Sequence, residues 1–270
     1  MPSVGRMSRS TLLRLTLDLA ADDYHAAARE LWEHPQLRSL FADYLFRIHT
    51  IIRASVPVME AARDAAASRA EHDPACAALA RYLEQHVPEE RHHDDWLIDD
   101  LAVLGVASSA VWSRQPSPTV AALVGAQYYW IHHHHPIAVL GYIAVLEGTP
   151  PDEQLVHDVM RSTGLPPDAF RTFIKHARLD PHHRDDLNAA LDAMPLSDAQ
   201  VELVTGAGCG LVLGGFQDLG IFGNRDVDAT CAQLSGMVAE IRSQLAERES
   251  QFPGQPNKTE VVMLEAQLLG

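Results

Sequence analysis

Acidic and imidazole side chains occur at metal-ligand spacing in the segment PEERHHDDWLIDDLAVLG, residues 88–105. At about 100° per residue, Glu90 and His93 fall on the helix face that carries Leu97 and Leu101, so we expect both to point into the core. Glu-x-x-His at this spacing is the ligand pair of di-iron helix bundles, because both groups can reach one metal ion from one helix.

A second pair has the same spacing in this segment. Glu89 and His92 lie on the flank of the predicted helix near Trp96, and not on its leucine face. We therefore prefer Glu90 and His93 as ligands. A solvated helix start with no ligand at all remains the alternative.

The segment FRTFIKHARLDPHHRDDLNAALDAM carries a larger group of metal-binding side chains. His176, Asp180 and His183 stand at positions i, i+4 and i+7, on the face that continues through Leu187. A single inward histidine is usually a hydrogen-bonded core residue. Burying two imidazoles and a carboxylate without partners would be costly, and a metal ion accounts for all three.

Pro181 lies between two of these candidate ligands. A proline removes one helical hydrogen bond and its ring clashes with the preceding turn. We therefore expect a bulge or unwound turn around residues 177–181, which would make one metal position labile.

Glu147 is the only acidic residue between Asp100 and Asp152. It shares a predicted helix face with Ile143, so a carboxylate at this position needs a partner, and we predict that it is a metal ligand. The alternative is an exposed glutamate at the helix end beside Gly148, which the helix dipole disfavours.

The run from His132 to His135 attracts attention as a metal site. Four consecutive residues point in different directions around a helix, so at most two of them could face one ion. We expect packing, capping of the kink at Pro136 and hydrogen bonding to other groups, and not direct ligation.

The spacing of apolar residues predicts an all-α fold. These residues recur at intervals of three and four, and no stretch alternates as a strand would. One domain is expected over residues 1–248, and a loosely held tail over 249–270 that could dock on a second copy as a homodimer. The predicted helices lie near 11–33, 36–69, 75–105, 117–148, 152–162, 167–192, 197–222 and 226–248.

Composition restricts the partners. The chain of 270 residues has 36 acidic and 21 basic side chains, which argues against nucleic acid and favours a small-molecule substrate. The cysteines Cys76, Cys209 and Cys231 have no paired spacing, so we predict neither a disulfide framework nor a cysteine zinc site. We expect no membrane segment and a reducing, cytoplasmic location.

Neither Glu-x-x-His pair is repeated, which separates the chain from ferritin-like di-iron bundles. The sequence instead resembles the haem-oxygenase-like di-iron oxidases and oxygenases, also called iron-containing redox enzymes. The matching segments cover residues 30–222 and read VPVMEAA, HVPEERHHDDWLIDDLAVLG, QYYWIHHHHP, GYIAVLEG and HARLDPHH.

This resemblance implies a single-domain haem-oxygenase-like bundle of about seven core helices. It also implies two irons, ferrous until O2 oxidises them. It adds Glu60, the early-helix carboxylate, to the ligands found above. The implied metal ligands are Glu60, Glu90, His93, Glu147, His176, Asp180 and His183.

The expected activity is O2-dependent oxidation of a small organic substrate. Similar proteins N-oxygenate amines. Others cleave C–C bonds in amino acids or fatty acids, or desaturate these substrates. A haem-binding or haem-degrading protein is an alternative that His25 and His34 keep open, and a metal-free helical binding protein is another. The contexts of His49 and Cys76 do not match the haem-ligand and catalytic-cysteine positions of haem oxygenases and thiaminase-like relatives.

Overall fold

The computed structural model describes residues 7–148 and 150–212, and every regular element in these ranges is helical. This confirms the predicted all-α class. None of the helices described is long and apolar enough to cross a membrane. The helices are α1 (Arg9–Ala20), α2 (Asp22–Trp32), α3 (Leu37–Ala67), α4 (Pro74–Glu90), α5 (His93–Val103), α6 (Ser108–Ser113), α7 (Pro118–His133), α8 (Val139–Gly148), α9 (Glu153–Thr163), α10 (Arg171–Ala193) and α11 (Asp198–Gly210), with 3₁₀ turns η1 (Pro136–Ala138) and η2 (Pro167–Phe170).

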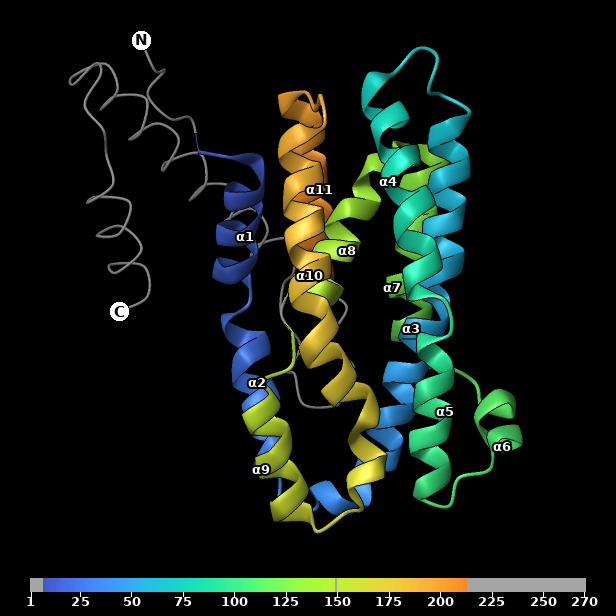
Figure 1. The fold of residues 1–270 in the computed structure, drawn as a ribbon, viewed down its shortest axis with the longest axis vertical. Helices are drawn as coiled ribbons and strands as arrows, with labels where there is room; N and C mark the ends of the chain where they lie inside the picture. The colour runs from blue at the N-terminus through green and yellow to red at the C-terminus, as the bar shows by residue number, and fades with distance from the viewer. Residues whose placement is uncertain (1–6, 149, 213–270) are drawn as a thin grey trace, which may run out of the picture.

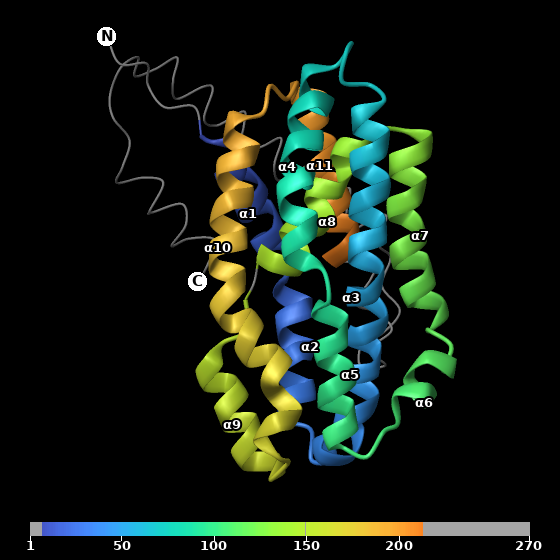
Figure 2. The same ribbon diagram turned by 45° about the vertical axis from the view of Figure 1, so that its right-hand side comes forward.

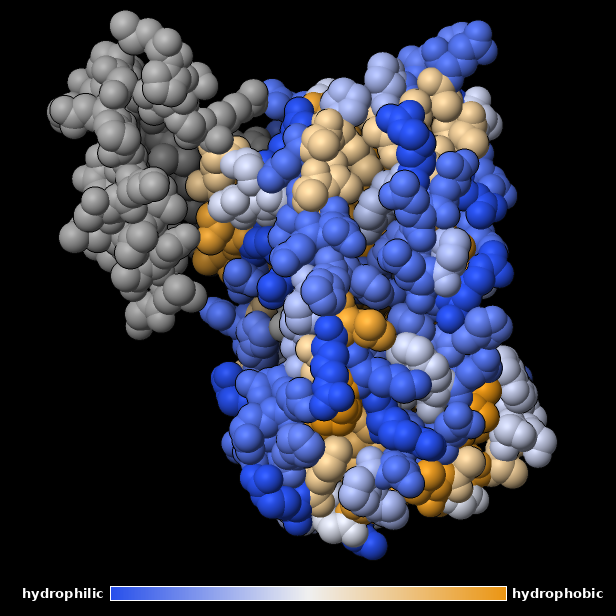
Figure 3. All heavy atoms as spheres, viewed as in Figure 1, coloured by the Kyte–Doolittle hydropathy of each residue, from blue (hydrophilic) through white to orange (hydrophobic). Residues whose placement is uncertain are grey.

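Two long helices, α3 and α10, run along most of the molecule (Figures 1 and 2). Helices α4 and α5 follow one another alongside α3, and α7 packs on α3 as well. The short helix α8 lies in the middle of the bundle, in contact with α3, α10 and α11. Figure 3 shows a mostly hydrophilic outer face with scattered hydrophobic side chains.

Buried apolar side chains form two separate clusters. One includes Met59, Leu79 and Tyr142 and holds α1, α4, α8 and α11 together. The other includes Phe41 and Phe170 and lies between the first half of α3, α5 and η2. The joint between α4 and α5 falls where the two clusters meet, so polar side chains at this joint can be buried without interrupting either core.

Three of the predicted helices are each divided into two helices in the structure. The segment 11–33 divides at Ala21, and 117–148 divides at His134, before Pro136. The segment 75–105 divides at Arg91, which is extended, and at His92, which has a left-handed φ of 71°. A non-glycine residue in this conformation is strained, and such strain is frequent at functional sites. The predicted helix 226–248 and the tail 249–270 lie outside the described residues.

The prediction of a bulge or unwound turn around residues 177–181 is wrong. Helix α10 is continuous from Arg171 to Ala193 with Pro181 inside it. The figures show a helix that curves along its length, which is how a helix accommodates one missing hydrogen bond (Figures 1 and 2). Its packing against α1, α5 and α8 holds the helix in place on both sides of the proline.

A close approach of two helix backbones fixes α8 in the centre. A Cβ atom on Gly141 would lie only 2.7 Å from the backbone nitrogen of Gly208 in α11 and would also clash with the Val204 carbonyl. Only glycine permits this contact. The contact determines how deeply α8, and therefore Glu147 at its end, enters the bundle.

Candidate metal centre

Four helices of the bundle bring acidic and imidazole side chains together. Helix α4 contributes its last turn, α5 its first residue, α8 its C-terminal end and α10 its middle. Five of these residues are buried, and each is at most 8% exposed. They are His86, His93, Glu147, Asp180 and His183.

Glu90 is the centre of this group. Its Oε1 lies 3.0 Å from His183 Nδ1, and its Oε2 lies 3.1 Å from His93 Nδ1. Despite these distances, Glu90 Oε1 and both Nδ1 atoms are buried without an aligned hydrogen bond. Donor atoms around a cation with bonds of about 2.1 Å stand roughly 3 Å apart. The atoms are therefore spaced as ligands of a shared ion would be.

The helix that was predicted to carry Glu90 and His93 together is interrupted between them. Glu90 ends α4 and His93 begins α5, yet the turn through Arg91 and His92 returns both side chains to one point. The preferred pair is also the buried one, because the side chains of Glu89 and His92 are 54% and 79% exposed.

His86 belongs to the group although sequence analysis missed it. Its Nε2 lies 3.0 Å from Glu147 Oε1, and donor atoms of His86, Glu90 and Glu147 all lie within 4.8 Å of one another. A signal existed, because His86 precedes Glu90 by four residues and so shares its helix face. Pro88, between the two, obscured the helical register.

His176 and Asp180 extend the group along α10. His176 Nδ1 donates to the Thr172 carbonyl at 2.9 Å, which leaves Nε2 free of a proton and able to bind a metal. The His176 ring stands 5.2 Å from the ring of His93. In the part of the chain that the structure describes, Asp180 Oδ1 is buried without a hydrogen-bond partner, and Asp180 lines the same cavity as His176 and Glu90.

Glu60 is not part of this group in the structure. Its side chain is 34% exposed and pairs with Arg91, while the preceding residue Met59 faces the core. The ligand role that the resemblance implied for Glu60 therefore requires the side chain to leave Arg91.

The carboxylates hold protons unequally. Burial, together with the charges of Glu147 and Glu90, raises the pKa of Asp180 to about 8. Burial also raises the pKa of Glu147. Burial acts the same way on Glu90, but His183 and His93 outweigh it and keep the pKa of Glu90 below its ordinary value.

The imidazoles respond to the same charges. Contact with Glu90 raises the pKa of His183 to about 9. Burial lowers the pKa of His176, which keeps that ring neutral. A cation entering the site would replace the protons that these groups otherwise share.

The donors fit iron. The group contains three carboxylates and four imidazoles, and several of its buried polar atoms have no hydrogen-bond partner. Oxygen and nitrogen ligands of this kind suit ferrous ions, and no cysteine of the described chain lies among them. His25 and His34, which kept haem open as an alternative, do not line the adjoining cavity.

Comparison with known proteins agrees with this assignment of fold. A domain of unknown function with a haem oxygenase-like fold from Shewanella denitrificans is 15% identical, with a TM-score of 0.60 over 90% of this chain and 94% of that chain. A TenA homologue from Pseudomonas syringae is 14% identical, with a TM-score of 0.58 over 86% and 99%. No curated protein matches the chain.

A family model described as iron-containing redox enzyme matches residues 41–215, which include every donor named above. This range is well over half of the chain and spans α4, α5, α8 and α10. The chain therefore belongs to the iron-containing redox enzyme family.

Proposed function

We propose that this protein is a non-haem di-iron enzyme that uses O2 to oxidise a small organic substrate. The observation that carries the proposal is the set of buried carboxylate and imidazole atoms around Glu90, which lie about 3 Å apart and have no aligned hydrogen bond within the described residues. Membership of an iron-containing redox family supports an oxidoreductase role.

The donor residues form two contact groups, to which two further residues of α10 are added. Glu90, His93 and His183 stand within about hydrogen-bonding distance of one another, and His86 and Glu147 form a second contact pair beside them. His176 and Asp180 complete the set from α10. Two ferrous ions held here would supply the electrons for reducing O2 and so permit oxidation of a neighbouring substrate.

A cavity of about 210 Å³ adjoins these donors. Its walls are mainly apolar, as is common for small-molecule sites. The apolar lining comes from Ile48, Ile52, Met59, Ile143 and Phe173.

One cation lines this cavity. Arg14 donates through Nη1 to the Ala144 carbonyl at 2.8 Å and through Nε to Asn188 at 3.1 Å. Its Nη2 is buried and has no hydrogen-bond partner among the residues that the structure describes. A free guanidinium nitrogen in an apolar cavity suits a substrate carboxylate, so the arrangement favours an amino acid or a fatty acid over a simple amine.

The test is anaerobic loading of the purified protein with ferrous ion, followed by iron quantitation and O2 uptake with amino-acid and fatty-acid substrates. We expect close to two irons per chain, no Soret band, and O2 uptake stimulated by a substrate. His183→Ala should lose iron and uptake. His182→Ala changes the exposed neighbouring histidine and should retain both. Full iron and uptake in His183→Ala, or a Soret band, would contradict the proposal.

A further inference from the structure

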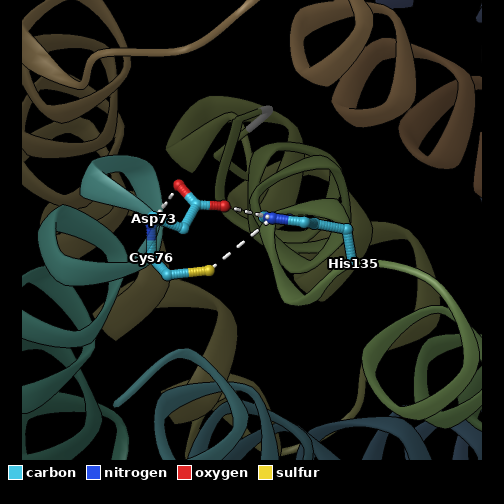
Figure 4. Close-up of side chains that lie close together, drawn as sticks. All are labelled: Asp73, Cys76 and His135. Atoms are coloured by element: carbon cyan, nitrogen blue, oxygen red, sulfur yellow. Dashed lines mark hydrogen bonds and ion pairs between the residues drawn. The ribbon is translucent and has the colours of Figure 1, made fainter. Parts of the chain in front are cut away.

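A second group of metal-binding side chains lies at the other end of α4. Asp73 caps the start of α4, Cys76 lies in its first turn, and His135 precedes η1 (Figure 4). His135 Nε2 lies 2.9 Å from Asp73 Oδ2 and 3.6 Å from Cys76 Sγ. One donor atom from each residue lies within 4.8 Å of the other two.

We propose that Asp73, Cys76 and His135 form a further metal site, which binds a thiophilic divalent cation such as zinc. The three side chains point toward one another from two separate segments (Figure 4). Sulfur, imidazole nitrogen and carboxylate oxygen together are typical ligands of Zn²⁺.

The spacing fits this ion. Tetrahedral bonds of about 2.3 Å to sulfur and about 2.0 Å to nitrogen separate the two donor atoms by roughly 3.5 Å. The observed separation of Sγ and Nε2 is 3.6 Å. No large movement of the backbone is therefore needed for binding.

The surroundings already orient the carboxylate. Asp73 Oδ1 accepts the backbone N–H groups of Ala75 at 2.8 Å and Cys76 at 3.3 Å, which leaves Oδ2 directed at His135. The Gln200 amide lies 3.5 Å from the same Oδ2. Ligands held in this way by neighbouring hydrogen bonds are typical of metal sites.

Binding has two identifiable costs. Burial and the charge of Asp73 raise the pKa of the Cys76 thiol to about 11, so the cation must displace its proton. His135 Nδ1 now accepts the N–H of Ile137 at 3.1 Å, which places the ring proton on Nε2. Coordination through Nε2 moves the proton to Nδ1 and breaks this one hydrogen bond. A cation can enter, because the side chains of His135 and Asp73 are 18% and 29% exposed.

The proposal departs from two predictions made from the sequence, that the chain has no cysteine zinc site and that the run from His132 to His135 does not bind a metal directly. Cys76 has no cysteine partner at zinc-ligand spacing, but His135 stands 59 residues further along the chain and is brought to it by the fold. The site is also distinct from the candidate metal centre. Residues 74 and 90 mark the two ends of α4, which are about 24 Å apart at 1.5 Å per residue.

Cobalt(II) titration of the metal-free full chain tests the proposal independently of enzyme activity. A Co²⁺ ion bound to a thiolate gives an intense near-ultraviolet charge-transfer band, which a centre of carboxylates and imidazoles does not give. We expect the band at saturation to have the intensity of one thiolate-bound Co²⁺ per chain, to disappear on addition of zinc, and to be absent in Cys76→Ser.

Two matched variants make the result decisive. The double variant Cys209→Ser with Cys231→Ser leaves Cys76 as the only cysteine and should keep the band. Asp73→Asn keeps a residue that caps helices well, so it should fold normally while binding Co²⁺ about tenfold or more weakly. Absence of the band in the natural sequence, or its persistence in Cys76→Ser, would overturn the proposal.

Discussion

The Glu90 carboxylate contacts two imidazoles from different helices, one at the start of α5 and one in α10. His93 and His183 lie 3.1 Å and 3.0 Å from its two oxygens, so this single carboxylate links the parts of the bundle that carry the other donors. Its neighbour His86 performs the same linking role for Glu147.

The first prediction contrasts His86 with Glu60. His86→Ala should weaken iron binding by about tenfold to a hundredfold, because it removes a buried nitrogen donor and leaves Glu147 without its partner. Glu60→Ala should leave iron content nearly unchanged, since it removes an exposed pair with Arg91. Equilibrium titration with ferrous ion measures both variants. The reverse ranking would show that Glu60 turns inward and that His86 is structural.

A second prediction concerns the stability of the metal-free protein. The folded-state pKa values of Asp180 and His183 are raised to about 8 and about 9, above their values in the unfolded chain. The folded protein therefore holds more protons than the unfolded chain between about pH 6.5 and pH 8, and its stability falls as pH rises. We expect a loss on the order of 2 kcal/mol across this window.

Urea unfolding at both ends of the window measures this loss. The iron-loaded protein should show little of it, because the metal has already replaced the protons. Asp180→Asn should reduce the loss to roughly half in the metal-free protein, since one of the two groups no longer titrates. A metal-free protein whose stability rises over this window would contradict the assigned protonation.

At the scale of elements, the position of α8 depends on a direct contact between its backbone and the backbone of α11. Gly141→Ala would place a methyl group against the backbone of α11, and the two helices would have to separate. We expect a cost of about 1–3 kcal/mol in unfolding free energy, with weaker iron binding because Glu147 moves with α8.

Gly206→Ala is the control for this change. A Cβ on Gly206 meets no atom within 4 Å, so the variant should be as stable as the natural protein or slightly more so. Thermal unfolding and iron titration compare the two. Equal stability for both variants would mean that the contact at Gly141 is loose.

The sequence predicted that the elements are helices better than it predicted where one helix ends and the next begins. Periodicity indicated helices throughout, and apolar stripes indicated that Glu90, His93 and Glu147 point inward. The break at His92 could not be predicted in this way. It depends on a left-handed backbone conformation, which usually occurs at glycine, and this position is a histidine. The continuous helix through Pro181 was also missed, because tertiary packing of α10 outweighs the local cost of the proline.

At the scale of the whole molecule, polar groups gather where two hydrophobic cores meet. One cluster surrounds α4 and α8, the other surrounds α5 and η2, and Glu90 and His93 stand at the joint. Contacts between distant segments decide which other residues belong to a site. The pairing of Cys76 with His135 and of Glu60 with Arg91 are contacts of this kind, and spacing along the chain contains no signal for them.

The presence of two irons at Glu90 can be tested by diffraction from crystals of anaerobically iron-loaded protein, with data collected on both sides of the iron absorption edge. We expect two anomalous peaks beside Glu90, surrounded by the other donors of the centre, with bonds of about 2.0–2.3 Å to oxygen and nitrogen atoms. The other donors are His86, His93, Glu147, His176, Asp180 and His183. An iron peak elsewhere, a haem group in the density, or no iron at Glu90 would contradict this expectation.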